Sequence, residues 1–335
     1  KDVTPSEAAK KIAASLLEQR RGAILLGNFA QQHPQAATLQ TLAQQLAQLT
    51  GATFGFLGEA ANSVGGYVAK ALPAGAGLNA AQMIAQSRQA YVLLGCEPEF
   101  DCADGRAVLA ALKEAKTVVA LTAFASEAML DYADVLLPIS PFSETSGTYV
   151  NTEGRVQSFY AATKPRGDAR PAWKVLRVLG NLLEVAGFDY ESSEQVKVEA
   201  LAGQGEFVAG LDNALADLSP SPLAPLPQER GTLSGAAANG LGGVADVRLD
   251  SPDPIVRRAP SLQATRDAAP PALRANAATL MQLGVADGMA VRANGVSLSA
   301  QLDAGVPDGC VRIAAAHAST IAAGPMFGAI TVEKA

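Results

Sequence analysis

Five short apolar runs, each followed by a loop of small or polar residues, constrain the fold of this chain more than any other feature. The runs cover residues 23–26, 53–57, 91–94, 117–121 and 135–137. Helical patterns separate them, among them residues 34–49 and 105–114. Runs of this kind are typical of buried parallel strands, whose crossover connections are helices. We therefore predict that residues 23–140 form a parallel sheet flanked by helices, the arrangement of an α/β fold.

The loops that follow the runs are candidates for lining a ligand cleft, because ligands of open α/β sheets bind at the carboxyl ends of the strands. These loops cover residues 27–30, 58–66, 95–99 and 122–127. None has the spacing of a dinucleotide-binding or phosphate-binding glycine loop, so they give little support to a nucleotide site. The acidic residues at 97–104 suggest solvated loop charge rather than paired catalytic carboxylates.

The pattern changes after Pro138. Residues 148–151 and 155–159 flank a turn at 152–154 and predict a hairpin, and an amphipathic helix is expected over 172–186. Proline and glycine are frequent over 219–275, a composition typical of a linker, with one ordered segment expected near 244–249. We predict an α/β domain over 1–190, a helix and Pro/Gly-rich linker over 191–275, and a small β-barrel-like module over 276–335.

The charge of the chain argues against nucleic acid as a partner. The 26 Lys and Arg residues are outnumbered by 32 Asp and Glu residues, giving a formal net charge of −6. Only 17% of the residues are charged, against about 25% in a typical domain. This indicates either a surface covered by protein partners or a bias toward alanine. The uncharged stretch 313–332 is too weakly hydrophobic to predict a membrane span.

Cysteine and histidine are too scarce for a metal site or a catalytic triad. Three cysteines form no disulfide framework and indicate a reducing compartment. An iron–sulfur cluster requires about four thiolates, and a zinc site about four ligands. His33 and His317 stand alone in the sequence. We expect no catalytic residue, no metal site and no redox centre in this chain.

Two blocks of sequence resemble a known family. Residues 133–138 read ADVLLP and residues 144–157 read ETSGTYVNTEGRVQ; together they resemble the molybdopterin oxidoreductase superfamily. Phe142-Ser143 precedes the second block, and residues 165–173 (PRGDARPAW) follow it. With these residues included, the sequence is most similar to the large peripheral-arm subunit of bacterial NADH–quinone oxidoreductase, respiratory complex I. Residues 276–288 and 306–309 resemble the C-terminal barrel of the superfamily.

The resemblance implies a candidate cofactor loop. In relatives that carry a pyranopterin dinucleotide, this loop helps to hold it through short donors, a glycine that permits close approach and a fixed positive charge. Here those residues are Thr145, Ser146, Gly147, Thr148, Asn151 and Arg155. In the other interpretation, Asp134, Glu144, Asn151 and Arg155 only lock the loop and hairpin against the sheet. We favour the second interpretation, because the complex I members are not thought to keep molybdenum.

The resemblance also implies a function that this chain performs only in part. Members of that subunit family bind [2Fe-2S] and [4Fe-4S] clusters through an N-terminal cysteine-rich region, which this sequence lacks. The chain, which starts at Lys1, therefore resembles the C-terminal scaffold part. Expected partners are other peripheral-arm subunits, on the cytoplasmic side of the bacterial inner membrane. The alternatives are a domain of a formate dehydrogenase-like enzyme that binds molybdopterin guanine dinucleotide, and an unrelated α/β enzyme. Residues 142–173 favour the scaffold part of the respiratory subunit over the domain that binds molybdopterin guanine dinucleotide.

Overall fold

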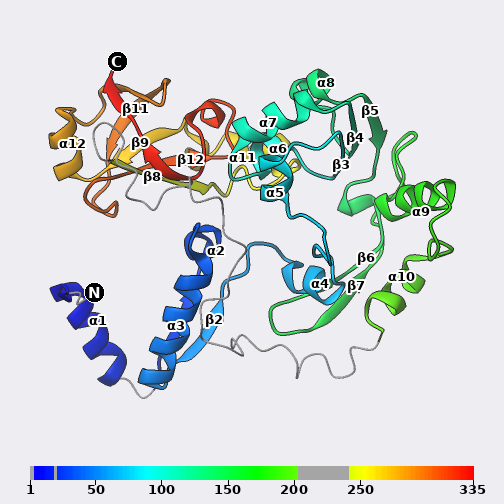
Figure 1. The fold of residues 1–335 in the computed structure, drawn as a ribbon, viewed down its shortest axis with the longest axis horizontal. Helices are drawn as coiled ribbons and strands as arrows, with labels where there is room; N and C mark the ends of the chain where they lie inside the picture. Colours follow the sequence, from blue (N-terminus) through cyan, green and yellow to red (C-terminus); the bar gives the residue numbers. More distant parts are fainter. Residues whose placement is uncertain (1–3, 19–20, 203–240) are drawn as a thin grey trace. The chain divides into compact units, whose positions relative to one another are not determined.

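The computed structural model describes residues 4–18, 21–202 and 241–335 (Figure 1). Their contacts divide the chain into two compact units. The first unit holds the described residues up to Gly66 together with Tyr149–Gln157, and the second holds the other described residues. No helix in these ranges is long and apolar enough to cross a bilayer.

The first unit is built around a two-stranded parallel sheet. Strand β1 (Ala23–Leu26) pairs with β2 (Thr53–Phe56), and the crossover between them contains α2 (Asn28–Gln32) and α3 (Ala36–Thr50). Helix α3 packs on both strands and ends at Gly51, whose φ of 71° is readily adopted only by glycine. Helix α1 (Glu7–Glu18) precedes the strands, and α4 (Ser63–Val68) begins where this unit ends.

A three-stranded parallel sheet forms the α/β layer of the second unit. Strands β3 (Ala90–Leu94), β4 (Thr117–Thr122) and β5 (Val135–Pro138) pair in chain order. The helices of this layer are α5 (Ala80–Ala85), α6 (Pro98–Asp101), α7 (Gly105–Glu114) and α8 (Glu127–Tyr132). Tyr91 and Val118 point toward α7 and α8, where they share a core with Leu112 and Met129. The predicted α/β class and parallel pairing are therefore confirmed.

One part of the prediction is wrong: the five strands do not form a single sheet. Strand β2 pairs only with β1, and β3 begins a separate sheet with β4. Between β2 and β3 lie about thirty residues with two short helices and a stretch rich in Gly, Pro and Ala at 71–77. Apolar runs show which segments become buried strands, but the partner of each strand is chosen by long-range contacts.

The predicted hairpin is confirmed: β6 (Gly147–Val150) pairs with β7 (Val156–Phe159) after a 3-10 turn at Phe142–Glu144. Helices α9 (Ala172–Leu182) and α10 (Ser193–Ala200) follow. Helix α9 is therefore shorter than the 172–186 expected. The chain turns back after α9, and the ring of Phe188 packs so closely on Gly180 that a Cβ there would lie 2.3 Å from it.

The C-terminal part of the second unit is a barrel-like sheet of seven strands in the order β13-β8-β12-β9-β11-β10-β14. Its residues Leu273, Val291 and Val311 are fully buried. The strands are β8 (Leu241–Val247), β9 (Ala272–Ala275), β10 (Ala290–Ala293), β11 (Val296–Leu302), β12 (Cys310–Ala315), β13 (Phe327–Ile330) and β14 (Val332–Lys334). Short helices α11 (Pro260–Gln263) and α12 (Ala277–Leu283) accompany them. The predicted barrel-like module is confirmed.

Part of the segment 191–275, interpreted from the sequence as a helix and a linker, contributes to this sheet. Strand β8 pairs with β12 in parallel and with β13 in antiparallel orientation. The residues 203–240, where much of the expected linker falls, lie outside the described residues. After β8, residues 248–271 form short helical turns that lead to β9.

We expect Leu112→Ala to lower the free energy of unfolding by about 2–5 kcal/mol, because it removes a fully buried side chain from the core between α7 and β4. Urea unfolding followed by circular dichroism measures the change. Leu130→Ala is the matched control, since Leu130 is 66% exposed and its replacement should cost less than about 0.5 kcal/mol. Equal losses for the two variants would contradict this description of the core.

Candidate functional site

The hydroxyl groups of the predicted cofactor loop are engaged within the chain. Thr145 Oγ1 donates to the Ser146 carbonyl at 3.1 Å. The Ser146 hydroxyl lies 2.8 Å from that of Ser193, the first residue of α10. The Thr148 hydroxyl lies 3.1 Å from that of Ser158 across the hairpin. These three donors therefore hold the loop to itself and to neighbouring segments.

Gly147 packs closely against Phe159 within the hairpin. A Cβ at this position would lie 2.7 Å from the ring of Phe159, so any other residue would require that ring to shift. The family resemblance implies that a glycine is present here so that a cofactor can approach the backbone closely. In the structure, the ring of Phe159 occupies that space.

Asn151 holds the turn of the hairpin, whereas Arg155 does not. The Asn151 Oδ1 atom accepts hydrogen bonds from the backbone N–H groups of Glu153 at 3.1 Å and Arg155 at 2.9 Å. The Arg155 side chain is exposed and forms no hydrogen bond or salt bridge with the part of the chain that the structure describes. Asp134 and Glu144, also proposed as locking residues, accept the backbone N–H groups of Val118 and Arg166.

Sequence reasoning missed a second cluster, in the loop that follows β3. The interpretation of Glu97 as solvated loop charge is wrong: Glu97 is 1% exposed and Glu99 is 3% exposed. Glu97 Oε2 accepts from Arg257 Nη1 at 2.7 Å and from Arg258 Nη1 at 3.1 Å, and its Oε1 accepts from Arg258 Nη2. Arg257 also pairs with Asp101. The only sequence signal was the adjacent pair of arginines, some 160 residues away.

Aromatic rings complete the surroundings of the two arginines. The Arg257 guanidinium lies 4.9 Å from the ring centroid of Phe100, and that of Arg258 lies 4.8 Å from the ring of Phe124. Phe124 belongs to the loop after β4, so the cluster spans the carboxyl ends of two adjacent strands. This is the edge at which ligands of open α/β sheets bind.

The carboxylates in this loop differ in their proton affinity. Burial alone would raise the pKa of Glu97, but the hydrogen bonds from Arg258 and Arg257 outweigh it and hold that pKa below its ordinary value. Burial raises the pKa of Glu99, and the nearby Glu97 and Asp101 carboxylates add to the rise. Burial likewise raises the pKa of the Cys102 thiol to about 11, so this cysteine is protonated and unreactive at neutral pH.

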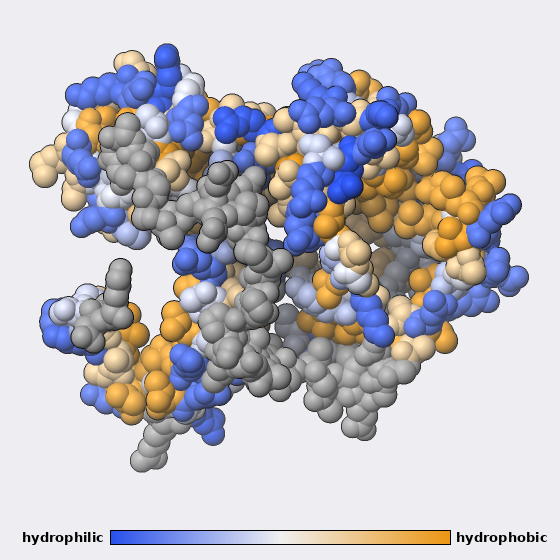
Figure 2. All heavy atoms as spheres, viewed as in Figure 1, coloured by the Kyte–Doolittle hydropathy of each residue, from blue (hydrophilic) through white to orange (hydrophobic). Residues whose placement is uncertain are grey.

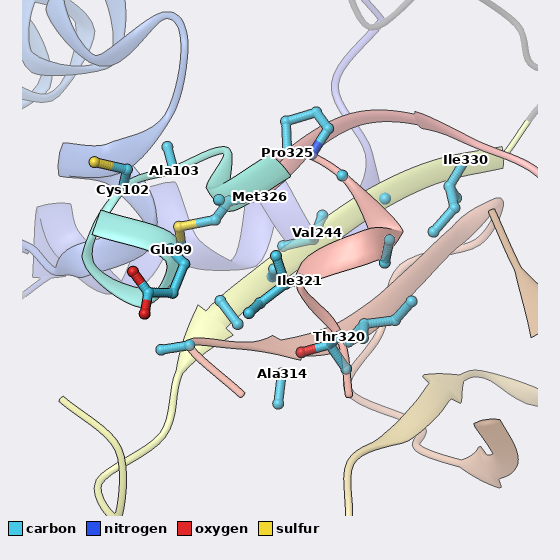
Figure 3. A pocket seen from close by; sticks show the side chains of 18 residues that line it. Glu99, Cys102, Ala103, Val244, Ala314, Thr320, Ile321, Pro325, Met326 and Ile330 are labelled. Carbon is cyan, nitrogen blue, oxygen red and sulfur yellow. The ribbon is translucent and has the colours of Figure 1, made fainter. Parts of the chain in front are cut away.

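A small cavity adjoins Glu99 in the second unit (Figure 3). Its walls come from Glu99, Cys102 and Ala103 in the α/β layer and from the C-terminal part of the unit, including Val244 of β8, Ile321 in a 3-10 turn and Met326 just before β13. The volume of about 50 Å³ accommodates one or a few water molecules. Glu99 Oε2 lies 3.4 Å from the Tyr132 hydroxyl, and Oε1 has no partner among the described atoms.

With this geometry in place, the chain can be compared with known proteins. The pattern of the molybdopterin oxidoreductase family matches residues 5–182, which is more than half of the sequence. The chain therefore belongs to the molybdopterin oxidoreductase family. The fold is similar to that of acetylene hydratase from Pelobacter acetylenicus, with a TM-score of 0.52 and 16% identity over 76% of this chain and 46% of that one. This second likeness concerns the fold alone.

Two groups of relatives match shorter stretches about equally well. The mitochondrial NADH-ubiquinone oxidoreductase 78 kDa subunit of Candida albicans is 51% identical over 67 residues, which cover 20% of this chain and 9% of that protein. A Staphylococcus aureus protein whose name describes it as a formate dehydrogenase is 49% identical over 59 residues, covering 18% and 6%. The matched stretches span less than a tenth of these relatives.

The family implies a molybdopterin cofactor, and the predicted loop does not offer it a free set of donors. Three hydroxyl groups and the Asn151 side-chain oxygen are used inside the chain, and the space beside Gly147 is filled by Phe159. Arg155 is the one charged group of the predicted set that extends into solvent. These residues do not fit a bound pterin dinucleotide, and we derive no chemistry through it.

If Asn151 stabilises the hairpin turn, Asn151→Ala should lower the free energy of unfolding by about 1 kcal/mol, because two backbone N–H groups lose their acceptor. Arg155→Ala should change it by less than about 0.5 kcal/mol, since the exposed side chain has no hydrogen bond or salt bridge with the described residues to lose. Urea unfolding of both variants measures the difference. A loss for Arg155→Ala as large as that for Asn151→Ala would contradict the assignment.

The buried Glu99 should make stability fall as the pH rises. Its folded-state pKa is raised, so the folded chain keeps this proton above pH 4.5, where the unfolded chain releases it. The contribution of protonated Glu99 to the free energy of unfolding is therefore fully present below pH 4.5 and decreases as the pH rises above it. Glu99→Gln cannot ionise, so its melting temperature should exceed that of the unmodified chain by a margin that grows from pH 4.5 toward neutrality.

Scanning calorimetry over this pH range tests the expectation. Glu114→Gln, at an exposed position at the end of α7, is the control and should leave the pH dependence unchanged. A constant gap between Glu99→Gln and the unmodified chain at all pH values would show that folding does not raise the pKa of Glu99.

Proposed function

We propose that this chain is the scaffold part of the large peripheral-arm subunit of an NADH–quinone oxidoreductase. In such an enzyme, electrons pass from NADH through iron–sulfur clusters to quinone, coupled to proton translocation. We propose that the [2Fe-2S] and [4Fe-4S] clusters bind to a cysteine-rich region outside this sequence and that this chain carries no redox centre. Its partners would be other peripheral-arm subunits, on the cytoplasmic side of the membrane.

One observation carries this proposal: three hydroxyl groups of the pterin-type loop and the Asn151 side-chain oxygen are engaged within the chain. A family member that keeps the fold but commits these groups to its own hairpin is suited to a structural role. The sequence of residues 142–173 and the match to the 78 kDa subunit also support a respiratory subunit. The equally strong match to the formate dehydrogenase-named protein sustains the alternative, a domain that binds molybdopterin guanine dinucleotide.

A partly exposed sheet face is consistent with a scaffold inside an assembly. Register places Val92, Val119 and Val135 in one row across the three-stranded sheet, on the face opposite α7 and α8. Parallel sheets are normally covered on both faces, yet Val92 is 61% exposed. Figure 2 shows other apolar side chains at the surface, in keeping with the low content of charged residues.

Purification of the native assembly through an affinity tag on this chain tests the proposal. We expect the purified assembly to oxidise NADH with reduction of a quinone, and elemental analysis to find iron without molybdenum. The isolated chain should show no visible absorption from an iron–sulfur cluster, because its three cysteines are too few for an all-cysteine site. Stoichiometric molybdenum together with formate oxidation would contradict the proposal and favour the alternative.

A further inference from the structure

The contacts of Glu97 have the form of a ligand in a receptor site. Both carboxylate oxygens accept hydrogen bonds from guanidinium groups, and Oε2 accepts from two different arginines. Arginine forks match the planar geometry of a carboxylate, which makes such charge-assisted pairs specific as well as strong. The carboxylate enters this site from one segment of the chain, and both arginines come from another.

The two segments belong to different layers of the second unit. Glu97 follows β3 in the three-stranded sheet, whereas Arg257 and Arg258 form a 3-10 turn in the connection between β8 and β9. Other anchors hold the arginine segment on its own side. Arg257 Nε donates to the Ser251 carbonyl at 3.2 Å, and Arg258 Nη1 donates to the Pro254 carbonyl at 3.0 Å. The guanidinium groups are thus positioned by the segment that carries them.

The rings of Phe100 and Phe124 form further walls of the site. They shield the arginines from water and present their electron-rich faces to the cations. The Arg257 side chain is 10% exposed and that of Arg258 is 32% exposed, so both guanidinium groups have lost much of their contact with water and are stabilised by an anion. Asp101 supplies one only to Arg257. Removal of Glu97 would leave Arg258 without a carboxylate partner among the described residues.

We propose that Arg257 and Arg258 form a carboxylate-binding site that the chain fills with its own Glu97. The bound side chain attaches the β8–β9 connection to the carboxyl edge of the three-stranded sheet. At this edge, where other α/β folds bind ligands, the site takes small carboxylates once its internal occupant is removed. The inference stands apart from the proposed respiratory function, because it depends only on contacts within the chain.

Chemical rescue tests the proposal. Glu97→Ala deletes the carboxylate and leaves a space of about the size of acetate between the two arginines. We expect this variant to melt well below the unmodified chain and millimolar acetate to recover a substantial part of the loss. Acetamide, which has the same shape without the charge, should recover none, and sodium chloride at equal ionic strength controls for screening.

Two matched variants separate a binding site from general destabilisation. Glu97→Gln fills the space with a neutral group and should not respond to acetate. Glu99→Ala removes the neighbouring buried carboxyl, which does not contact the arginines, and should not respond either. Rescue of Glu97→Ala by acetamide as well as acetate, or equal rescue of Glu99→Ala, would overturn the proposal.

Limited proteolysis gives a second readout for the attachment. Residues 248–271 should become more susceptible to cleavage in Glu97→Ala and regain protection when acetate is added. If Glu97→Ala fails to fold, refolding in millimolar acetate replaces the melting experiment, and recovery of native circular dichroism is then expected. Failure of acetate to restore either folding or protection would contradict the proposal.

Discussion

The ion pairs of the buried Glu97 carboxylate join two layers of the second unit. Removing a carboxylate and two guanidinium groups from water is costly, and the cost is offset only when every charged atom finds a partner. Here both Glu97 oxygens are paired, and Arg257 also binds Asp101. These pairs attach the β8–β9 connection to the loop after β3, and the small cavity beside Glu99 adjoins the same loop.

The residue types of the candidate cofactor loop suit two different roles. The residues that suggest a pterin site are short donors, and short donors are equally suited to closing a hairpin. In this chain, Asn151 organises the turn and Ser146 contacts the start of α10. Similar residue types thus support membership in the molybdopterin oxidoreductase family while the contacts support a structural role.

The three-stranded sheet also exposes apolar residues. A parallel sheet normally buries both faces, but in the row that contains Val92 that residue is 61% exposed and Val135 is 43% exposed. The few charged residues in the sequence are consistent with surfaces that meet other protein. Both features agree with a part of a larger assembly, the context in which we place the proposed function.

The sequence by itself determined the local structure: the short strands, the hairpin turn and helices such as α7, which lies where the pattern over 105–114 predicted it. These follow from patterns within a few residues. Only the tertiary structure decided that β2 and β3 lie in separate sheets, and that Glu97 is buried against arginines some 160 residues away. Neighbouring residues cannot encode such choices, because strand partners and ion pairs depend on which distant segments compete for the same buried surface.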